Sequence, residues 1–370
     1  MLHEIRQQPR AVRDTLAGRL DVESGRVVQE TLPLSASEMK SLAWIQIAAS
    51  GTSRYAGLFG KYVIEDLAGI PVRVEYASEL ECHSYSFIPP LTILISQSGE
   101  TADTLAALRK GKRDDSRTLA ICNVEDSSMM READYTLHTK AGPELSVPST
   151  KAFGAQLASL LVLALAFAQA RHSLPDQEME RYVRELTNTP EKLDIVLQLE
   201  SRCSEIAARL CPISDFIFFG RGPHYPIALD GALKLKEAAY IHTEGYPGGE
   251  FKHGQITLID QDIVAIVIAT CDDTNLESRD RYRRQLECAK EIKSLSGHVV
   301  VLATEGDQEI AAVADEVLYV PTGPELLVPL LEIVPFEMLA YYIAVRRGLD
   351  PDQPRNLSKA VTNQRTHLSS

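Results

Sequence analysis

The stretch that decides the fold reads Leu94-Ile95-Ser96-Gln97-Ser98-Gly99-Glu100-Thr101-Ala102-Asp103-Thr104-Leu105. An apolar run ends in a turn of small polar residues, and a segment with acidic and hydroxyl side chains in its first turn follows directly. This order predicts a buried strand, a tight turn and a helix. A strand followed by a helix is the basic unit of an α/β fold.

The same unit recurs along the whole chain. Short runs rich in Val and Ile alternate with helix-length segments, a pattern typical of a parallel sheet that helices cover on both faces. We expect strands at 44–48, 71–74, 91–95, 118–122 and 135–137, and again at 216–219, 241–244, 264–268, 299–302 and 317–320. The predicted fold class is therefore α/β.

The two sets of strands belong to an internal duplication. The sequence Gly-Pro-Glu-Leu-Ser-Val-Pro at 142–148 returns as Gly-Pro-Glu-Leu-Leu-Val-Pro at 323–329. Upstream, Ser50-Gly51-Thr52-Ser53-Arg54-Tyr55 corresponds to Gly220-Arg221-Gly222-Pro223-His224-Tyr225. These repeats predict two similar lobes. We expect a helical arm at 1–35, a first lobe at 36–170, a helical connector at 171–200, a second lobe at 201–345 and a tail at 346–370.

Composition excludes several classes of protein. The 370 residues hold 38 Lys and Arg against 51 Asp and Glu, a net charge of −13 that does not suit a nucleic-acid partner. The apolar stretch 157–168 is shorter than the roughly 20 residues of a membrane-spanning helix, so we expect a buried helix and no membrane partner. No secretory leader is recognisable, which predicts a cytoplasmic protein. Six cysteines without a CxxC pair indicate neither disulfides nor a zinc site.

The turn at 96–101 is the first candidate site. The carboxyl end of a strand meets a helix N-terminus there, which offers free backbone N–H groups and a positive dipole end. Hydroxyls of Ser96, Ser98 and Thr101 add further donors, so the turn suits a phosphate group. A plain N-cap explains the same residues, and the sequence alone leaves both interpretations open. Gly51-Thr52-Ser53 should meet the turn at the carboxyl edge of the sheet.

Three other segments carry groups capable of proton transfer or covalent chemistry. Lys234 and Glu237 share one face of a predicted helix, although a solvated ion pair would explain that spacing equally well. His253 lies in a loop rich in Gly and Pro, where it is either a solvated side chain or a proton carrier. Lys359 lies in the tail, and nothing in its spacing alone makes it chemical.

With these segments in view, the sequence resembles the sugar isomerase (SIS) domain family, and within it the isomerase half of the glutamine–fructose-6-phosphate aminotransferases. The motifs that carry the resemblance occur in order at 4–9, 96–104, 149–153, 225–237 and 352–357. The resemblance implies two tandem flavodoxin-like SIS lobes, each a parallel sheet sandwiched by helices. It also implies a homodimer whose active site lies between the lobes and is partly completed by the neighbouring subunit.

The resemblance also implies a role for each matching residue. Glu237 matches the base that moves a proton between C1 and C2, and Lys234 matches a group that supports the enediolate oxygen. His253 matches the ring-opening histidine donated across the dimer interface, and Lys359 matches the lysine that forms an imine with the sugar. Val147 and Ser358 would line the pocket, and no cofactor or metal is implied. The residues expected to bind the substrate phosphate are Thr52, Ser53, Ser96, Gln97, Ser98 and Thr101.

The sequence departs from the resembled pattern in places. Those aminotransferases carry a glutaminase domain with a terminal cysteine nucleophile, whereas the first cysteine here is Cys82. We therefore expect no glutamine hydrolysis by that route. Ser50, Ser358 and the loop 246–255 also differ from the usual residues, which puts ammonia delivery and the placement of the tail in question.

These observations predict an isomerase that interconverts fructose 6-phosphate and glucosamine 6-phosphate with ammonia released or incorporated. Without a glutaminase, mass action favours the deaminase direction. The alternatives are the isomerase domain of the aminotransferase or an ammonia-dependent synthase, a deglycase of fructosamine phosphates, and a sugar-phosphate-binding regulator. A regulator should have lost its catalytic groups and gained a basic DNA-binding segment, and the sequence shows neither change.

Overall fold

The computed structural model describes residues 1–82 and 89–360 and contains two five-stranded parallel sheets. All the strands expected from the sequence are confirmed. In spatial order the first sheet holds β4 (Val72–Tyr76), β3 (Ile45–Ala49), β5 (Leu91–Ser96), β6 (Arg117–Cys122) and β7 (Tyr135–His138). The second holds β9 (His242–Pro247), β8 (Asp215–Gly220), β10 (Ile263–Ala269), β11 (His298–Thr304) and β12 (Glu316–Val320).

The two sheets have the same topology. Numbered from the first strand of each sheet, both follow the order 2-1-3-4-5, which is the flavodoxin-like order of doubly wound α/β folds. The shared order confirms two tandem α/β lobes, as the repeated sequence motifs predict.

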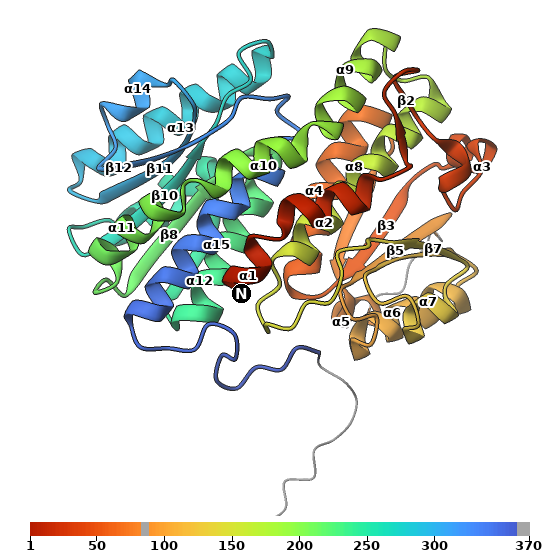
Figure 1. Ribbon diagram of the computed structural model, residues 1–370, viewed down its shortest axis with the longest axis horizontal. Helices are drawn as coiled ribbons and strands as arrows, with labels where there is room; N and C mark the ends of the chain where they lie inside the picture. The colour runs from red at the N-terminus through yellow and green to blue at the C-terminus, as the bar shows by residue number, and fades with distance from the viewer. Residues whose placement is uncertain (83–88, 361–370) are drawn as a thin grey trace, which may run out of the picture.

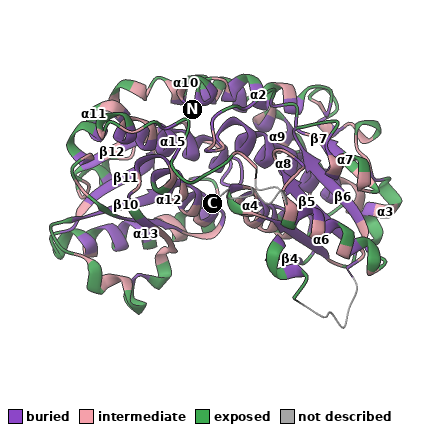
Figure 2. Ribbon diagram, turned by 90° about the horizontal axis from the view of Figure 1, so that it is seen from below, coloured by how far each residue is buried: buried purple, intermediate pink, exposed green. Residues whose placement is uncertain are grey.

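Long helices fill the space between the sheets (Figure 1). They are α4 (Gly51–Ala68) and α8 (Lys151–Arg171) from the first lobe, and α12 (Tyr225–Ala239) and α15 (Pro329–Arg346) from the second. The outer faces carry α5 (Ala77–Leu80), α6 (Ala102–Arg113) and α7 (Ser128–Glu132) on one lobe, and α13 (Leu276–Ser294) and α14 (Gln308–Ala311) on the other. Because one apolar cluster includes Phe59, Phe153, Phe218 and Phe336, the core is continuous across both lobes (Figure 2).

Helix α8 contains the apolar stretch 157–168. By length and composition it could cross a membrane, but 94% of its apolar window is buried inside the protein. Helix α8 packs against α4 and against α2 (Gln8–Leu16), so other helices of the protein cover it. The expectation of a buried core helix is confirmed.

The segments outside the lobes are mixed in structure. The arm holds α1 (Leu2–Ile5), α2 and a short hairpin of β1 (Leu20–Asp21) and β2 (Arg26–Val27), then η1 (Gln29–Thr31), and α3 (Ala36–Ser41) follows it. The arm is therefore helical only in its first half. The connector holds α9 (Asp176–Thr187) and α10 (Thr189–Leu197), and α11 (Glu200–Leu210) leads into the second lobe. Within the described part of the tail, 347–360, the chain runs without helix or strand, and 361–370 lie outside the described residues.

A glycine in the turn after β5 gives a test of this local structure. Gly99 has φ +68, and a Cβ there would overlap Ser127 and approach the Cys122 Sγ to 2.8 Å. Gly69 has a similar φ of +62 but open space around it. We expect Gly69→Ala to cost about 1–2 kcal/mol of unfolding free energy from backbone strain alone. Gly99→Ala should cost about 2–5 kcal/mol, because overpacking adds to the strain. Equal losses in urea denaturation would contradict this local structure.

Candidate functional site

A cavity of about 240 Å³ opens at the carboxyl ends of β3 and β5 in the first lobe. All the site residues predicted from the sequence line this cavity, except Lys234 and His253. Its walls are Ser50, Gly51, Thr52, Ser53, Ile95, Ser96, Gln97, Ser98, Thr101, Thr104, Val147, Ser149, Glu237, Leu357, Ser358, Lys359 and Ala360.

The topology places the cavity there. From β3 the chain enters α4, on the face toward the second lobe, whereas from β5 it enters α6, on the outer face. The two connections leave the sheet in opposite directions, and a crevice opens between them at the carboxyl edge. Doubly wound sheets bind their ligands at this point.

Two helix N-termini face the crevice. Ser50 precedes α4 and Thr101 precedes α6, and neither side chain accepts a capping hydrogen bond from its own helix. The first-turn N–H groups therefore remain available to an anion, and both helix dipoles favour negative charge. For the turn at 96–101, the alternative of a plain side-chain N-cap is therefore wrong, because Thr101 does not cap α6.

Hydrogen bonds fix the turn between β5 and α6. The Ser96 Oγ accepts a bond of 3.0 Å from the Gly99 N–H, and the Ser98 Oγ accepts one of 3.2 Å from the Glu100 N–H. Glu100 in turn accepts a bond of 2.7 Å from the Ser128 N–H. The turn is held in this shape by the protein itself, so an anion would meet preformed donors.

Lys234 joins the two lobes beneath the cavity. Its Nζ donates a bond of 2.8 Å to the Thr52 Oγ1 on α4 and one of 3.0 Å to the Glu237 Oε2 on α12. The Lys234 side chain is 0% exposed and that of Glu237 is 20% exposed. The solvated ion pair considered from the sequence is therefore wrong. Glu237 reaches the cavity, while Lys234 supports it from behind.

Asp230, one helical turn before Lys234, is a further buried residue of the site that was not predicted from the sequence. Its carboxylate is fully buried, with Oδ1 3.7 Å from the Lys234 Nζ. Burial raises the pKa of Asp230 to about 6, because the nearby Lys234 ammonium offsets the lost hydration only in part. Burial alone would lower the pKa of Lys234, but Asp230 and Glu237 outweigh it and raise that pKa. The i, i+4 spacing was the signal available in the sequence.

Lys359 enters the cavity from the tail. Its Nζ donates a bond of 2.7 Å to the Glu144 Oε2 and one of 2.5 Å to the Ser146 carbonyl. The Val147 N–H donates to the Asp352 carbonyl at 2.9 Å, which attaches the tail to the 143–148 loop. The fold thus brings Lys359, remote in sequence, to the same cavity as Glu237.

His253 is the predicted site residue that this chain does not bring to the cavity. It ends the 3-10 helix η3 (Gly248–His253) and is exposed. The interpretation of His253 as a residue donated by a neighbouring subunit remains a prediction.

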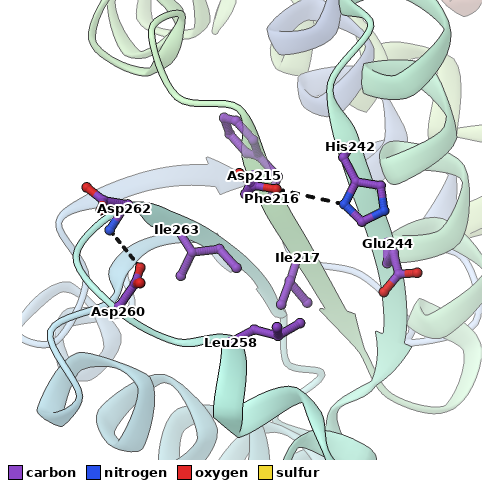
Figure 3. A pocket seen from close by; sticks show the side chains of 9 residues that line it. All are labelled: Asp215, Phe216, Ile217, His242, Glu244, Leu258, Asp260, Asp262 and Ile263. Atoms are coloured by element: carbon purple, nitrogen blue, oxygen red, sulfur yellow. Dashed lines mark hydrogen bonds and ion pairs between the residues drawn. The ribbon is translucent and has the colours of Figure 1, made fainter.

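A second cavity, of about 330 Å³, lies at the amino ends of β8, β9 and β10 in the second lobe (Figure 3). None of the predicted site residues is among its lining residues, which are Asp215, Phe216, Ile217, His242, Glu244, Leu258, Asp260, Asp262 and Ile263. In the described parts of the chain, no group of three or more His, Cys, Asp or Glu is arranged to hold a metal ion. The carboxyl-edge cavity is therefore the better candidate.

Comparison with known proteins agrees with this geometry. The sequence matches the SIS domain over residues 43–166 and 213–347, one match in each lobe. The chain belongs to the SIS domain family.

Its relatives include aminotransferases. The glutamine–fructose-6-phosphate aminotransferase (isomerizing) of Chlorobaculum tepidum is 44% identical over 98% of this chain, which spans 58% of that protein's length. The C-terminal domain of glucosamine–fructose-6-phosphate aminotransferase from Francisella tularensis is 35% identical, with a TM-score of 0.88 over 95% of this chain and 97% of that one. The glucosamine-6-phosphate deaminase of Thermotoga maritima, 22% identical with a TM-score of 0.74 over 98% of this chain and 99% of that one, shares the fold.

The buried Asp230 predicts a pH dependence of stability. Because burial raises its pKa in the folded protein to about 6, from the usual 3.8, its stabilising contribution is complete below about pH 4 and is lost as the pH rises through 6. Asp230→Asn removes this loss. The unfolding free energy of the variant relative to wild type should therefore rise by roughly 2 kcal/mol between pH 4 and pH 7, measured by urea denaturation. A difference that stays constant over this range would contradict the assignment.

Proposed function

We propose that the carboxyl-edge cavity of the first lobe converts fructose 6-phosphate and ammonia into glucosamine 6-phosphate and water. A single observation carries the proposal. A carboxylate, a lysine amine and two uncapped helix N-termini, from four separate parts of the chain, line one small cavity. An isomerase of a phosphorylated amino sugar needs this combination: a base, a carbonyl-activating amine and an anion site.

The substrate phosphate binds at the turn 96–101 and the first turn of α4. Hydroxyls of Ser53, Ser96, Ser98 and Thr101 and the amide of Gln97 supplement the backbone N–H groups. Ser53 is already oriented, because its Oγ accepts a bond of 3.0 Å from the Gln156 Nε2. Holding the phosphate fixes where C1 and C2 lie and reduces the entropy cost of the reaction.

Lys359 activates the carbonyl. Once its ammonium has lost a proton to water, the neutral amine attacks C2 of the open-chain ketose, water leaves, and an imine forms between Nζ and C2. Ammonia then displaces Nζ, so that the amine of Lys359 is restored and the new nitrogen stays on C2. Val147 and Ser358 line the same cavity as this amine.

Glu237 completes the isomerisation. Its carboxylate takes a proton from C1 and returns one to C2, while the C1 hydroxyl becomes the aldehyde of glucosamine 6-phosphate. The Lys234 ammonium, 3.0 Å from the same carboxylate, orients it and stabilises negative charge that develops on the sugar. No cofactor enters this scheme.

The direction of reaction rests on the relatives. The sequence alone favours deamination, but the relatives at 42–44% identity are named as aminotransferases, which supports the synthetic direction instead. Deamination is the reverse of the same steps, and it stays a prediction. A cytoplasmic location and a homodimer stay predictions as well. The ammonia for the reaction is either free in solution or released by a glutaminase.

Two variants test the chemical roles. Glu237→Gln should lower the rate of glucosamine 6-phosphate formation by about 10²–10⁴-fold, because it removes the proton carrier and keeps the shape. Lys359→Ala should abolish the adduct that borohydride traps between wild type and fructose 6-phosphate. Product is measured with saturating ammonium chloride, and Arg284→Ala, on the exposed side of α13, serves as the control. Full activity of either site variant would contradict its assigned role.

Subunit mixing tests the role of His253. If His253 acts across a dimer interface, His253→Ala and Glu237→Gln are each inactive alone. Random reassociation should then restore about a quarter of wild-type activity, because half of the dimers are mixed and each has one intact site. Size-exclusion chromatography gives the oligomeric state. A mixed dimer without activity would contradict donation across the interface.

A further inference from the structure

The duplication places one buried glutamate at equivalent positions of both lobes. Glu144 and Glu325 are each the third residue of the repeated Gly-Pro-Glu motif. Their side chains are 0% and 3% exposed. A carboxylate buried to this extent needs a cation or several donors, because its lost hydration otherwise costs several kcal/mol.

In the second lobe, Glu325 finds its cations within the lobe. The Arg281 guanidinium, from α13, binds it through two nitrogens, and the His224 Nε2 lies 3.4 Å away. The pKa of Glu325 falls to about 2 because His224 and Arg281 together outweigh the effect of its burial. Arg281 and His224, both from the second lobe, therefore balance the negative charge of Glu325.

In the first lobe, the corresponding partners are missing. Arg54 takes the place of His224 in the repeat, but its guanidinium stacks on the Tyr76 ring, 3.7 Å from the ring centroid. The cation that reaches Glu144 is instead Lys359, at 2.7 Å and from 215 residues away in the chain.

Glu144 itself is held rigidly. Its Oε1 accepts bonds from the backbone N–H groups of Thr150 at 2.9 Å and Ala152 at 3.1 Å. Its Oε2 accepts one from the Ser149 Oγ at 3.1 Å as well as the bond from Lys359. Donors at the start of α8 thus fix the carboxylate, and its position determines where the lysine amine lies.

We propose that Glu144 is a positioning residue, which holds the Lys359 amine at the edge of the substrate cavity and docks the tail onto the first lobe. The inference deepens the proposed function and rests on it, because the imine assigned to Lys359 requires its Nζ to lie within reach of C2. The second lobe satisfies the equivalent glutamate internally and has no such lysine.

Trapping the imine with borohydride tests the proposal on the full chain. Wild type, Glu144→Gln and the matched control Glu325→Gln are incubated with fructose 6-phosphate, and the adduct on Lys359 is quantified by mass spectrometry. Glu144→Gln should slow adduct formation by about 10- to 100-fold, because the amine is no longer held in place. Its affinity for fructose 6-phosphate should stay unchanged, since the phosphate-binding residues are untouched.

Glu325→Gln removes an equally buried carboxylate and should leave trapping at the wild-type rate. Urea denaturation of all three proteins separates folding from positioning. If Glu144→Gln does not fold, Glu144→Asp replaces it, since the charge stays but the shorter side chain cannot reach both Lys359 and the α8 N–H groups. We expect Glu144→Asp to slow trapping as well.

Wild-type trapping in Glu144→Gln or Glu144→Asp would overturn the inference and leave the proposed function standing. So would an equal loss in a folded Glu325→Gln variant. Absence of any adduct on Lys359 in wild type would instead overturn the imine chemistry, and the inference with it.

Discussion

The structure depends on a buried ammonium group between the lobes. Lys234, on α12 of the second lobe, donates to Thr52 on α4 of the first and pairs with Glu237 beside it. A buried charge without its partners is strongly destabilising, so these contacts fix how the two lobes meet. The same contacts place the Glu237 carboxylate in one cavity with the turn at 96–101, which belongs to the other lobe. The apolar core shared by the lobes stabilises their interface, and the Lys234 contacts set the geometry of the site within it.

The two lobes share one fold through duplication, but they differ in the residues around the equivalent Glu144 and Glu325. Both sheets have the same strand order, so each has a topological switch point between corresponding strands. In the first lobe, small hydroxyl residues leave this point open to a ligand. In the second, His224 and Arg281 occupy the region around Glu325 and bind it permanently. The tail crosses to the first lobe, and its Lys359 lines the open cavity there.

Local pattern was sufficient to predict the strands and the strand–turn–helix unit around residues 96–101. Val and Ile runs suit buried parallel strands, and a turn directly before a helix leaves the N–H groups of the first helical turn without partners in the helix. Contacts between distant segments were not predictable in this way. The burial of Lys234 depends on packing between lobes, and the partnership of Glu144 with Lys359 depends on where the tail returns. The hairpin inside the arm was also missed, because two-residue strands leave no periodic signal. The roles of Glu237 and Lys359 came from resemblance to a family, and the structure adds that both side chains line one cavity.

Proton exchange at the sugar carbon tests the central claim most directly. The wild-type protein is incubated with fructose 6-phosphate in D₂O without ammonia, and the C1 hydrogens are followed by proton NMR. Abstraction of a C1 proton by a base at this site predicts enzyme-dependent loss of one C1 hydrogen signal, which excess inorganic phosphate suppresses by competing at the 96–101 turn. Retention of both C1 hydrogens, in a protein that demonstrably binds fructose 6-phosphate, would contradict the assignment of this cavity as an isomerase site.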